Sequence, residues 1–196
     1  KISKRRRIFL MYTYEELKHF VCACNRCSLY KTRNHPVMGK GNLHSSILFI
    51  AEAPGQTEDQ NGIPFTGRSG QIFDQLLTEA DMSRDEIYLT NVVKCHPPRN
   101  RDPLPEEQEA CIPYLKYETL LLRPKIIVCL GRIAAQRIIR PNFRITREHG
   151  TFVTRKNVCL TAVYHPSAIL RDPTKFAETV RDFQAIKKKL QNTGPM

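Results

Sequence analysis

The stretch at 47–70 constrains the fold of this chain more than any other, because an apolar run meets a glycine-rich polar loop there. Residues Ile47–Ala51 are all apolar, a pattern typical of a strand that is buried on both faces of a parallel sheet. The run stops at the carboxylate of Glu52, and a tight turn at 53–55 leads into the loop. Open α/β folds bind ligands where a strand ends and such a loop begins. We therefore expect a ligand site at this end of the strand.

Apolar runs alternate with segments of helical spacing along the chain. The expected strands are Ile47–Ala51, Ile87–Thr90, Ile126–Leu130 and Val158–Tyr164. The expected helices lie at about 13–21, 68–80, 104–122, 133–139 and 174–190. Loops are expected at 30–44, at 95–101 and at 140–157, where a short hairpin is the alternative. Strands that alternate with helices favour a parallel sheet covered on both faces. We predict a single α/β domain at 13–192, with a central four-stranded parallel sheet flanked by helices on both faces, after a basic N-terminal extension at 1–12.

Each expected strand ends in a distinctive group. These groups are Glu52, Asn91, the pair Gly131-Arg132, and His165. The carboxyl ends of parallel strands meet at one edge of the sheet, so residues far apart in the sequence can share one crevice there. Taken singly, each group has an ordinary structural explanation, as a turn residue or a hydrogen-bonded loop side chain. The coincidence of all four favours a functional site.

The composition points to a polyanionic partner. The chain has 196 residues and a formal net charge of +12, which fits nucleic acid as a partner. A solvated basic surface is the alternative that charge alone leaves open. No apolar run approaches the length of a membrane span, so we expect a soluble protein without a membrane partner.

The cysteines form a second pattern. Their number, seven, is odd, and the chain does not resemble a small secreted scaffold, so a disulfide framework is not expected. Cys24 and Cys27 are spaced to hold one metal centre, which could be zinc, an iron–sulfur cluster or a redox site. Cys95 and Cys111 could join them. One close pair with two distant members suits an iron–sulfur cluster at least as well as zinc.

Several ordered motifs together carry a family resemblance. They are the run Ala51-Glu52-Ala53-Pro54-Gly55, the pair Glu58-Asp59, the set Gly62, Pro64, Phe65 and Gly67, then Asn91, and the run His165-Pro166-Ser167-Ala168-Ile169-Leu170-Arg171. With the four cysteines they resemble the family 4 uracil-DNA glycosylases, the iron–sulfur members of the uracil-DNA glycosylase superfamily, over about Tyr14 to Leu190. The chain departs from the family pattern at Ala51, where glycine is usual, and at Thr66, where valine is common.

The resemblance implies a set of site residues. It implies catalytic roles for Glu52 and His165; contacts to uracil from Ala53, Phe65 and Asn91; contacts to DNA from Pro54, Gly55, Ser167, Leu170 and Arg171; and a [4Fe-4S] cluster on Cys24, Cys27, Cys95 and Cys111. The implied activity is repair of DNA by flipping uracil out of the helix and hydrolysing its N-glycosidic bond. The implied cluster has a structural role, since hydrolysis needs no electrons.

Each implied role has a physical counterpart. Phe65 offers a flat apolar face to a flipped base, and the Asn91 amide can pair with both O4 and N3–H of uracil if something fixes its orientation. Glu52 can stabilise a cationic sugar and activate water, and His165 can donate a hydrogen bond to the leaving base. Leu170 is our choice for a side chain that fills the gap left by the base, with packing beneath its own loop as the alternative.

Two other functions remain open from the sequence. One is a non-enzymatic iron–sulfur module that binds DNA, and the other is a glycosylase of the same superfamily for another base, such as hypoxanthine or a mismatched thymine. The resemblance further implies a monomer in a bacterial or archaeal cytoplasm, acting on single- or double-stranded DNA that contains uracil.

Overall fold

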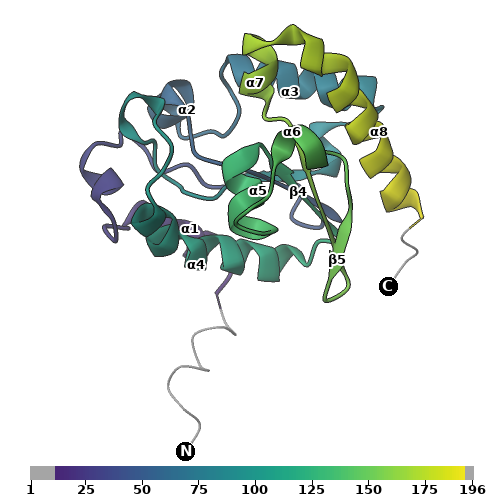
Figure 1. The fold of residues 1–196 in the computed structure, drawn as a ribbon. Coiled ribbons are helices and arrows are strands. Elements are labelled where there is room, and N and C mark those ends of the chain that lie inside the picture. Colours follow the sequence, from purple (N-terminus) through teal and green to yellow (C-terminus); the bar gives the residue numbers. More distant parts are fainter. Residues whose placement is uncertain (1–11, 193–196) are drawn as a thin grey trace, which may run out of the picture.

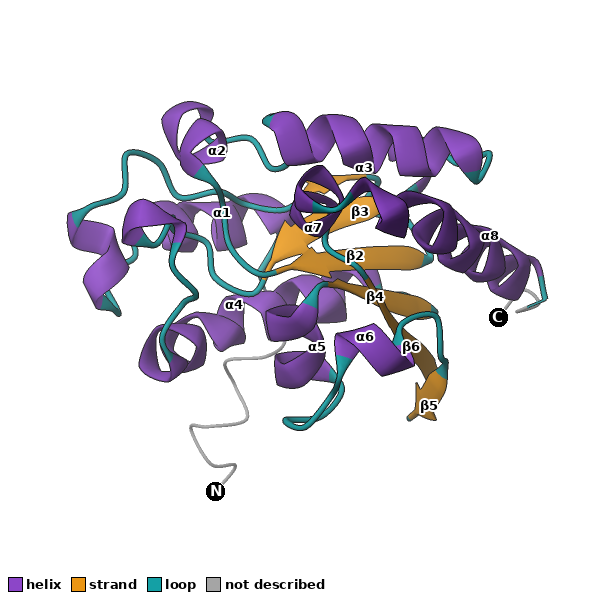
Figure 2. Ribbon diagram, turned by 45° about the horizontal axis from the view of Figure 1, so that its top comes forward, coloured by secondary structure: helices purple, strands orange, loops and turns teal. Residues whose placement is uncertain are grey.

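A six-stranded sheet between two layers of helices forms the structure (Figures 1 and 2). This computed structural model describes residues 12–192, so the basic extension expected at 1–12 lies outside it except for Tyr12. The strand order is β1-β3-β2-β4-β6-β5. The prediction of a single α/β domain with helices on both faces of the sheet is confirmed.

The four predicted strands form the parallel centre of the sheet. They are β2 (Ile47–Ala51), β3 (Tyr88–Asn91), β4 (Ile126–Leu130) and β6 (Val158–Val163). Side chains along β2 alternate between two cores: Leu48 and Ile50 belong to one, and Phe49 belongs to the other. Both faces of the strand are therefore buried, which explains why its residues are apolar without alternation.

The predicted number of strands is wrong, because two edge strands add to the expected four. β1 (Lys40–Gly41) pairs with β3, and β5 (Val153–Arg155) pairs with β6, both antiparallel. All five of their residues are exposed. Short exposed edge strands carry no apolar run, so a search for buried strands does not detect them. The sequence left a short hairpin as an alternative at 140–157; β5 lies in that stretch, but its partner β6 lies beyond it.

Helices cover both faces of the sheet. The α-helices are α1 (Tyr14–Cys22), α2 (Gln56–Asn61), α3 (Arg68–Glu79), α4 (Pro105–Leu122), α5 (Arg132–Ile138), α6 (Ile145–Glu148), α7 (Pro166–Arg171) and α8 (Phe176–Gln191), with 3₁₀ turns η2 (Ser28–Lys31), η3 (Arg84–Glu86), η4 (Pro98–Asn100) and η5 (Pro173–Lys175). Residues of α4 and α5 share a core with one face of the sheet, and residues of α3, α7 and α8 share a core with the other. Figure 2 shows these two layers. None of the helices within 12–192 has the length and apolarity needed to cross a bilayer.

Several short helices lie where loops were expected. They are η2, α2, η4, α6 and α7, each of three to six residues. Helices this short show no clear apolar period, so they are recognised only by their ends. Leu170, which was expected in a loop, lies instead on α7, which begins with Pro166 in its first turn and His165 as its N-cap.

Candidate active site

A cleft of about 640 Å³ lies at the carboxyl edge of the parallel strands. The groups that end all four strands line it: Glu52, Asn91, the pair Gly131-Arg132, and His165. Parallel pairing explains this, because Ala51 lies opposite Asn91 in the register of β2 and β3. The structure therefore brings together the residues that the sequence predicted would share one crevice.

The loop after β2 is held by a buried carboxylate. Glu58 is 8% exposed and accepts hydrogen bonds from the backbone N–H groups of Gly55 at 3.1 Å, Thr66 at 3.0 Å and Gly67 at 2.9 Å. One side chain thus ties the first glycine of the loop to the start of α3. The sequence showed Glu58 only as part of a motif and gave no sign of this role.

Phe65 is held in an uncommon backbone conformation at the wall of the cleft. Its φ is +56°, a region that non-glycine residues with bulky side chains seldom occupy. Arg84 donates to the Phe65 carbonyl at 2.8 Å, and a Cβ atom on Gly70 would lie 2.0 Å from that oxygen. The ring of Phe65 lies 5.8 Å from the ring of His165, centroid to centroid. The backbone is therefore fixed so that an aromatic face lines the cleft.

Asn91 presents an unpaired polar atom beside the cleft. The residue is 1% exposed, and its Oδ1 is buried with no hydrogen-bond partner among the described residues. A buried acceptor without a partner costs roughly 1–3 kcal/mol, and native proteins seldom keep one without a reason. The amide of Asn91 is thus free to accept a hydrogen bond from a ligand.

The hydrogen bonds of His165 fix its tautomer. Its Nδ1 accepts the backbone N–H of Ser167 at 3.1 Å and lies 2.7 Å from the Ser167 hydroxyl. Burial of the ring, and then the Arg171 guanidinium, lower the pKa of His165 to about 4. The neutral ring therefore carries its proton on Nε2, which can donate a hydrogen bond in the cleft.

Glu52 lies next to two charged groups, Arg132 and Asp102, of which the sequence pointed to Arg132 alone. Burial, with a smaller effect of the Asp102 carboxylate, raises the pKa of Glu52 to about 7, and the Arg132 guanidinium limits the rise. Arg132 also forms an ion pair with Asp102 at 2.6 Å. Such a carboxyl group can gain or lose a proton near neutral pH. The position of Arg132, just after a predicted strand, marked it in the sequence. Asp102 lies in a proline-rich loop, and no pattern in the sequence marked it.

The remaining predicted contacts lie around the same cleft, with one exception. Ala53, Pro54, Gly55, Ser167 and Arg171 line it with the residues above. Within 12–192, the side chains that line the cleft include Ala168 but not Leu170. Leu170 is half-buried on α7, so its role as a wedge stays a prediction.

A separate small cavity is lined by the four predicted cysteines. Cys24, Cys27, Cys95 and Cys111 lie around it, although they come from the segment after α1, the segment after β3, and α4. Within the described part of the chain, no three histidine, cysteine or acidic side chains lie close enough together to hold one metal ion. The thiols therefore surround a space rather than one point.

Hydrogen-bond donors point at two of these sulfur atoms. Arg33 Nη1 lies 3.1 Å from the sulfur of Cys95, and the backbone N–H of Lys94 lies 3.2 Å from that of Cys111. Burial raises the pKa of Cys111 to about 12 and raises that of Cys95. Deprotonation is therefore unfavourable unless a positive centre binds the sulfur, and the donors would then stabilise the thiolates.

Comparison with known proteins agrees with this geometry. The family model of the uracil DNA glycosylase superfamily matches residues 38–191. A type-4 uracil-DNA glycosylase of Archaeoglobus fulgidus is 38% identical over 188 residues, which cover 90% of this chain and 92% of that protein. One of Thermotoga maritima is 40% identical over 170 residues, or 83% of this chain and 88% of that protein. A type-5 uracil-DNA glycosylase of Pyrobaculum aerophilum is 30% identical over 151 residues, which cover 68% of this chain and 66% of that protein.

We predict that the two neighbours of Glu52 shift its titration in opposite directions. In Asp102→Asn the pKa of Glu52 should fall, because a negative charge that favours the protonated form is removed. In Arg132→Gln it should rise, because a positive charge that favours the carboxylate is removed. The ¹³C chemical shift of the Glu52 carboxyl, followed by NMR from pH 4 to pH 9, measures both. Equal pKa values in the three proteins would contradict this electrostatic coupling.

We also predict that Gly70→Ala destabilises the protein. Alanine usually improves a helix by about 1 kcal/mol over glycine, but its Cβ would lie 2.0 Å from the Phe65 carbonyl oxygen. Overpacking of this kind costs about 1–3 kcal/mol, so the net free energy of unfolding should fall. Urea denaturation measures it. Gly67→Ala is the matched control, since its new Cβ meets nothing closer than 3.3 Å; equal effects of the two substitutions would contradict the clash.

Proposed function

The chain belongs to the type-4 uracil-DNA glycosylases of the uracil-DNA glycosylase superfamily, and from this premise we propose that it removes uracil from DNA by hydrolysing the bond between the base and deoxyribose. The product is an abasic site. The observation that carries the proposal is the buried, unpartnered Oδ1 of Asn91 in a cleft shared with Glu52 and His165.

The cleft suits a base that has left the stack. A glycosylase reaches its target bond only after the nucleotide is extruded, and the rings of Phe65 and His165 offer flat surfaces to such a base. Asn91 Oδ1 can accept from N3–H of uracil, and its NH₂ group can donate to O4. Cytosine carries an acceptor at N3 and a donor at C4, so the same orientation of Asn91 disfavours it.

His165 assists departure of the base. Negative charge develops on uracil as the glycosidic bond breaks, and a neutral imidazole with its proton on Nε2 can donate a hydrogen bond to it. The low pKa keeps the ring neutral, so this donor does not depend on protonation near pH 7. Ser167 holds the ring from its other nitrogen.

Glu52 assists the sugar side of the reaction. Positive charge develops on the deoxyribose, and the Glu52 carboxylate stabilises it and orients or activates the attacking water. Because the pKa of Glu52 is about 7, the active carboxylate becomes more abundant as the pH rises through neutrality. The rate of excision should rise over the same interval.

The rim of the cleft suits the DNA backbone. Pro54 and Gly55 form a tight turn, Ser167 offers a hydroxyl, and Arg171 is an exposed cation. Hydroxyls and guanidinium groups are usual contacts to phosphate, and Gly55, which has no side chain, lets a phosphate approach the turn closely. We assign Leu170 to the gap left by the extruded base. The net charge of +12 adds long-range attraction to the DNA.

The cysteine cavity suits a [4Fe-4S] cluster. Its donor set is four thiols, the ligand set of such clusters, in which each cysteine binds a different iron atom. Cys24, Cys27, Cys95 and Cys111 would hold the cluster, and hydrogen bonds from Arg33 and the Lys94 backbone would stabilise the bound thiolates. The cluster would supply structural order to the loop that follows Cys95.

We expect Glu52→Ala to abolish most excision and leave DNA binding nearly intact. Loss of a general base or charge stabiliser lowers the rate about 10²- to 10⁴-fold. An oligonucleotide with one deoxyuridine, single-stranded or paired with G or A, is incubated with each protein and cleaved with alkali to count abasic sites. Parallel substrates with hypoxanthine or a T·G mismatch test the other-base alternative. Binding by wild type without any abasic product would favour a non-enzymatic module and contradict the proposal.

We expect Cys95→Ser to lose bound iron and sulfide and to weaken DNA binding, because the loop after Cys95 would no longer be anchored. Iron and sulfide analysis, visible absorption and DNA affinity measure these effects. Cys22→Ser is the matched control, since Cys22 is exposed and does not line the cavity. Full iron content in Cys95→Ser, or equal losses in both variants, would contradict this ligand assignment.

A further inference from the structure

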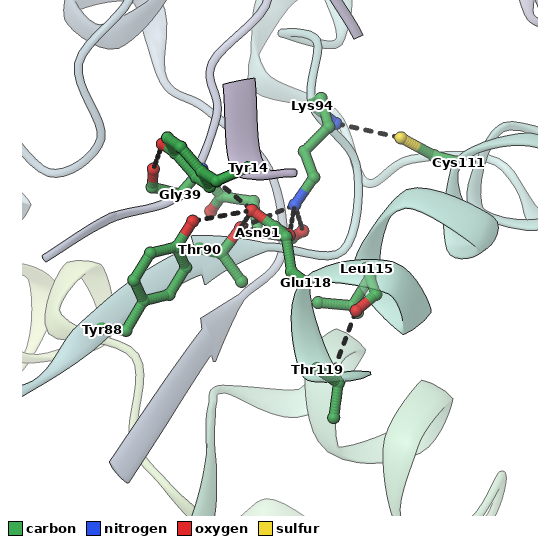
Figure 3. A network of polar contacts seen from close by, with 10 residues as sticks. All are labelled: Tyr14, Gly39, Tyr88, Thr90, Asn91, Lys94, Cys111, Leu115, Glu118 and Thr119. Atoms are coloured by element: carbon green, nitrogen blue, oxygen red, sulfur yellow. Dashed lines mark hydrogen bonds and ion pairs between the residues drawn. The ribbon is translucent and has the colours of Figure 1, made fainter. Parts of the chain in front are cut away.

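A lysine and a glutamate form an ion pair that is almost completely buried. Lys94 Nζ lies 2.5 Å from Glu118 Oε2, and the two side chains are 1% and 0% exposed. Lys94 lies just after β3, and Glu118 lies on α4 (Figure 3). Burial of two charges costs several kcal/mol per ion before their attraction offsets it. Apolar side chains of similar size are often as stable or more stable, so the pair calls for another explanation than stability.

The hydrogen bonds around this pair are complete. The ammonium of Lys94 has three donors, and they find Glu118, the Thr90 hydroxyl at 2.6 Å and the Asn91 carbonyl at 2.9 Å. The carboxylate of Glu118 also accepts from Thr90, from the Tyr88 hydroxyl at 3.2 Å and from the Gly39 N–H at 3.1 Å. Such a fully satisfied network has one low-energy arrangement and therefore fixes the atoms that take part in it.

One of those atoms belongs to Asn91, whose side chain lines the cleft. The segment around Asn91 is tied on one side to the end of β2. The backbone N–H of Val92 donates a hydrogen bond to the carbonyl of Ala51, and the backbone N–H of Val93 donates one to the carbonyl of Glu52. The Lys94 ammonium ties the Asn91 carbonyl from the other side. The side-chain oxygen of Asn91 has no partner of its own, so the backbone contacts determine the place and direction from which this side chain enters the cleft.

We propose that Lys94 and Glu118 are positioning residues for base recognition, and that their ion pair fixes the backbone of Asn91 at the place from which its amide reaches uracil. The inference rests on the proposed function, because it gives the fixed amide its ligand. A displacement of about 1 Å in such a group can lower a rate about 100-fold.

The test removes both charges together. Lys94→Met alone leaves an unpaired buried carboxylate, which strongly destabilises a protein and can prevent folding. Lys94→Met/Glu118→Gln keeps the side-chain volumes, leaves no buried charge and removes the donor to Asn91. Tyr88→Phe is the matched control, because it removes one hydrogen bond from the same buried network without touching the contact between Lys94 and Asn91.

Three measurements separate positioning from stability. They are the single-turnover rate of uracil excision, the inhibition constant of free uracil, and the affinity for the same DNA with a tetrahydrofuran abasic analogue, each compared with the thermal unfolding temperature. In the double variant we expect excision and uracil affinity to fall about 10- to 100-fold. Affinity for the abasic analogue should change little, because that DNA has no base for Asn91 to contact. Tyr88→Phe should keep all three values.

Two outcomes would overturn the inference. One is a double variant that retains excision and uracil affinity, and the other is an equal loss in Tyr88→Phe at the same unfolding temperature. If wild type excises no uracil, the proposed function fails, and a crystal structure of the double variant still decides the positioning role. A moved Asn91 carbonyl or a second rotamer of its amide supports that role, and an unchanged Asn91 contradicts it.

Discussion

The parallel pairing of β2 with β3 is the constraint on which the site depends. Ala51, the last residue of β2, lies opposite Asn91, the last residue of β3. Glu52, which follows Ala51, therefore comes to the same edge of the sheet as Asn91. β4 and β6 continue the pattern and bring Gly131 and His165 there. The close approach of the last two strands has its own requirement: Gly131 has a φ of +87°, and a Cβ there would lie 2.9 Å from the Cβ of His165. The glycine at the end of β4 thus allows the histidine to reach the cleft.

Apolar periodicity and strand order were enough to predict the fold and the edge that carries the site. Continuous apolar runs have no other low-energy place than the centre of a parallel sheet, so those strands were predicted within a residue or two. The edge strands and short helices were not predicted from the sequence, because local caps and backbone pairing determine them rather than an apolar pattern. α2 shows this: a side chain within the helix, Glu58, accepts the N–H of its N-cap, Gly55. Likewise, Asp102 reaches Glu52 only through tertiary packing, which no spacing in the sequence records.

Three ionisable groups near the site are wholly or partly buried, and each has a different set of neighbouring groups. Glu52 is held near its titration point, with a pKa of about 7, because Arg132 only partly offsets burial and the charge of Asp102. His165 stays neutral, with a pKa of about 4, so it can donate without carrying charge. Lys94 is buried with a partner for each of its donors, namely Glu118, Thr90 and the Asn91 carbonyl. One small region can therefore hold a carboxyl group that titrates near neutrality, a neutral hydrogen-bond donor and a buried ion pair, since each has a different set of partners.

The segment that follows β3 connects the cleft to the cysteine cavity. It begins at Asn91 in the cleft, passes Cys95 in the cysteine cavity, and returns to the cleft at 100–102. Its far end is anchored by Arg101, which makes two hydrogen bonds, at 2.7 and 2.8 Å, to the buried carboxylate of Glu107 on α4. Both Glu107 and Glu118 lie on α4, so one helix fixes the two ends of this segment by two buried carboxylates. In the proposed function a cluster bound to Cys95 would hold its middle, and all three anchors together would determine the shape of this wall of the cleft.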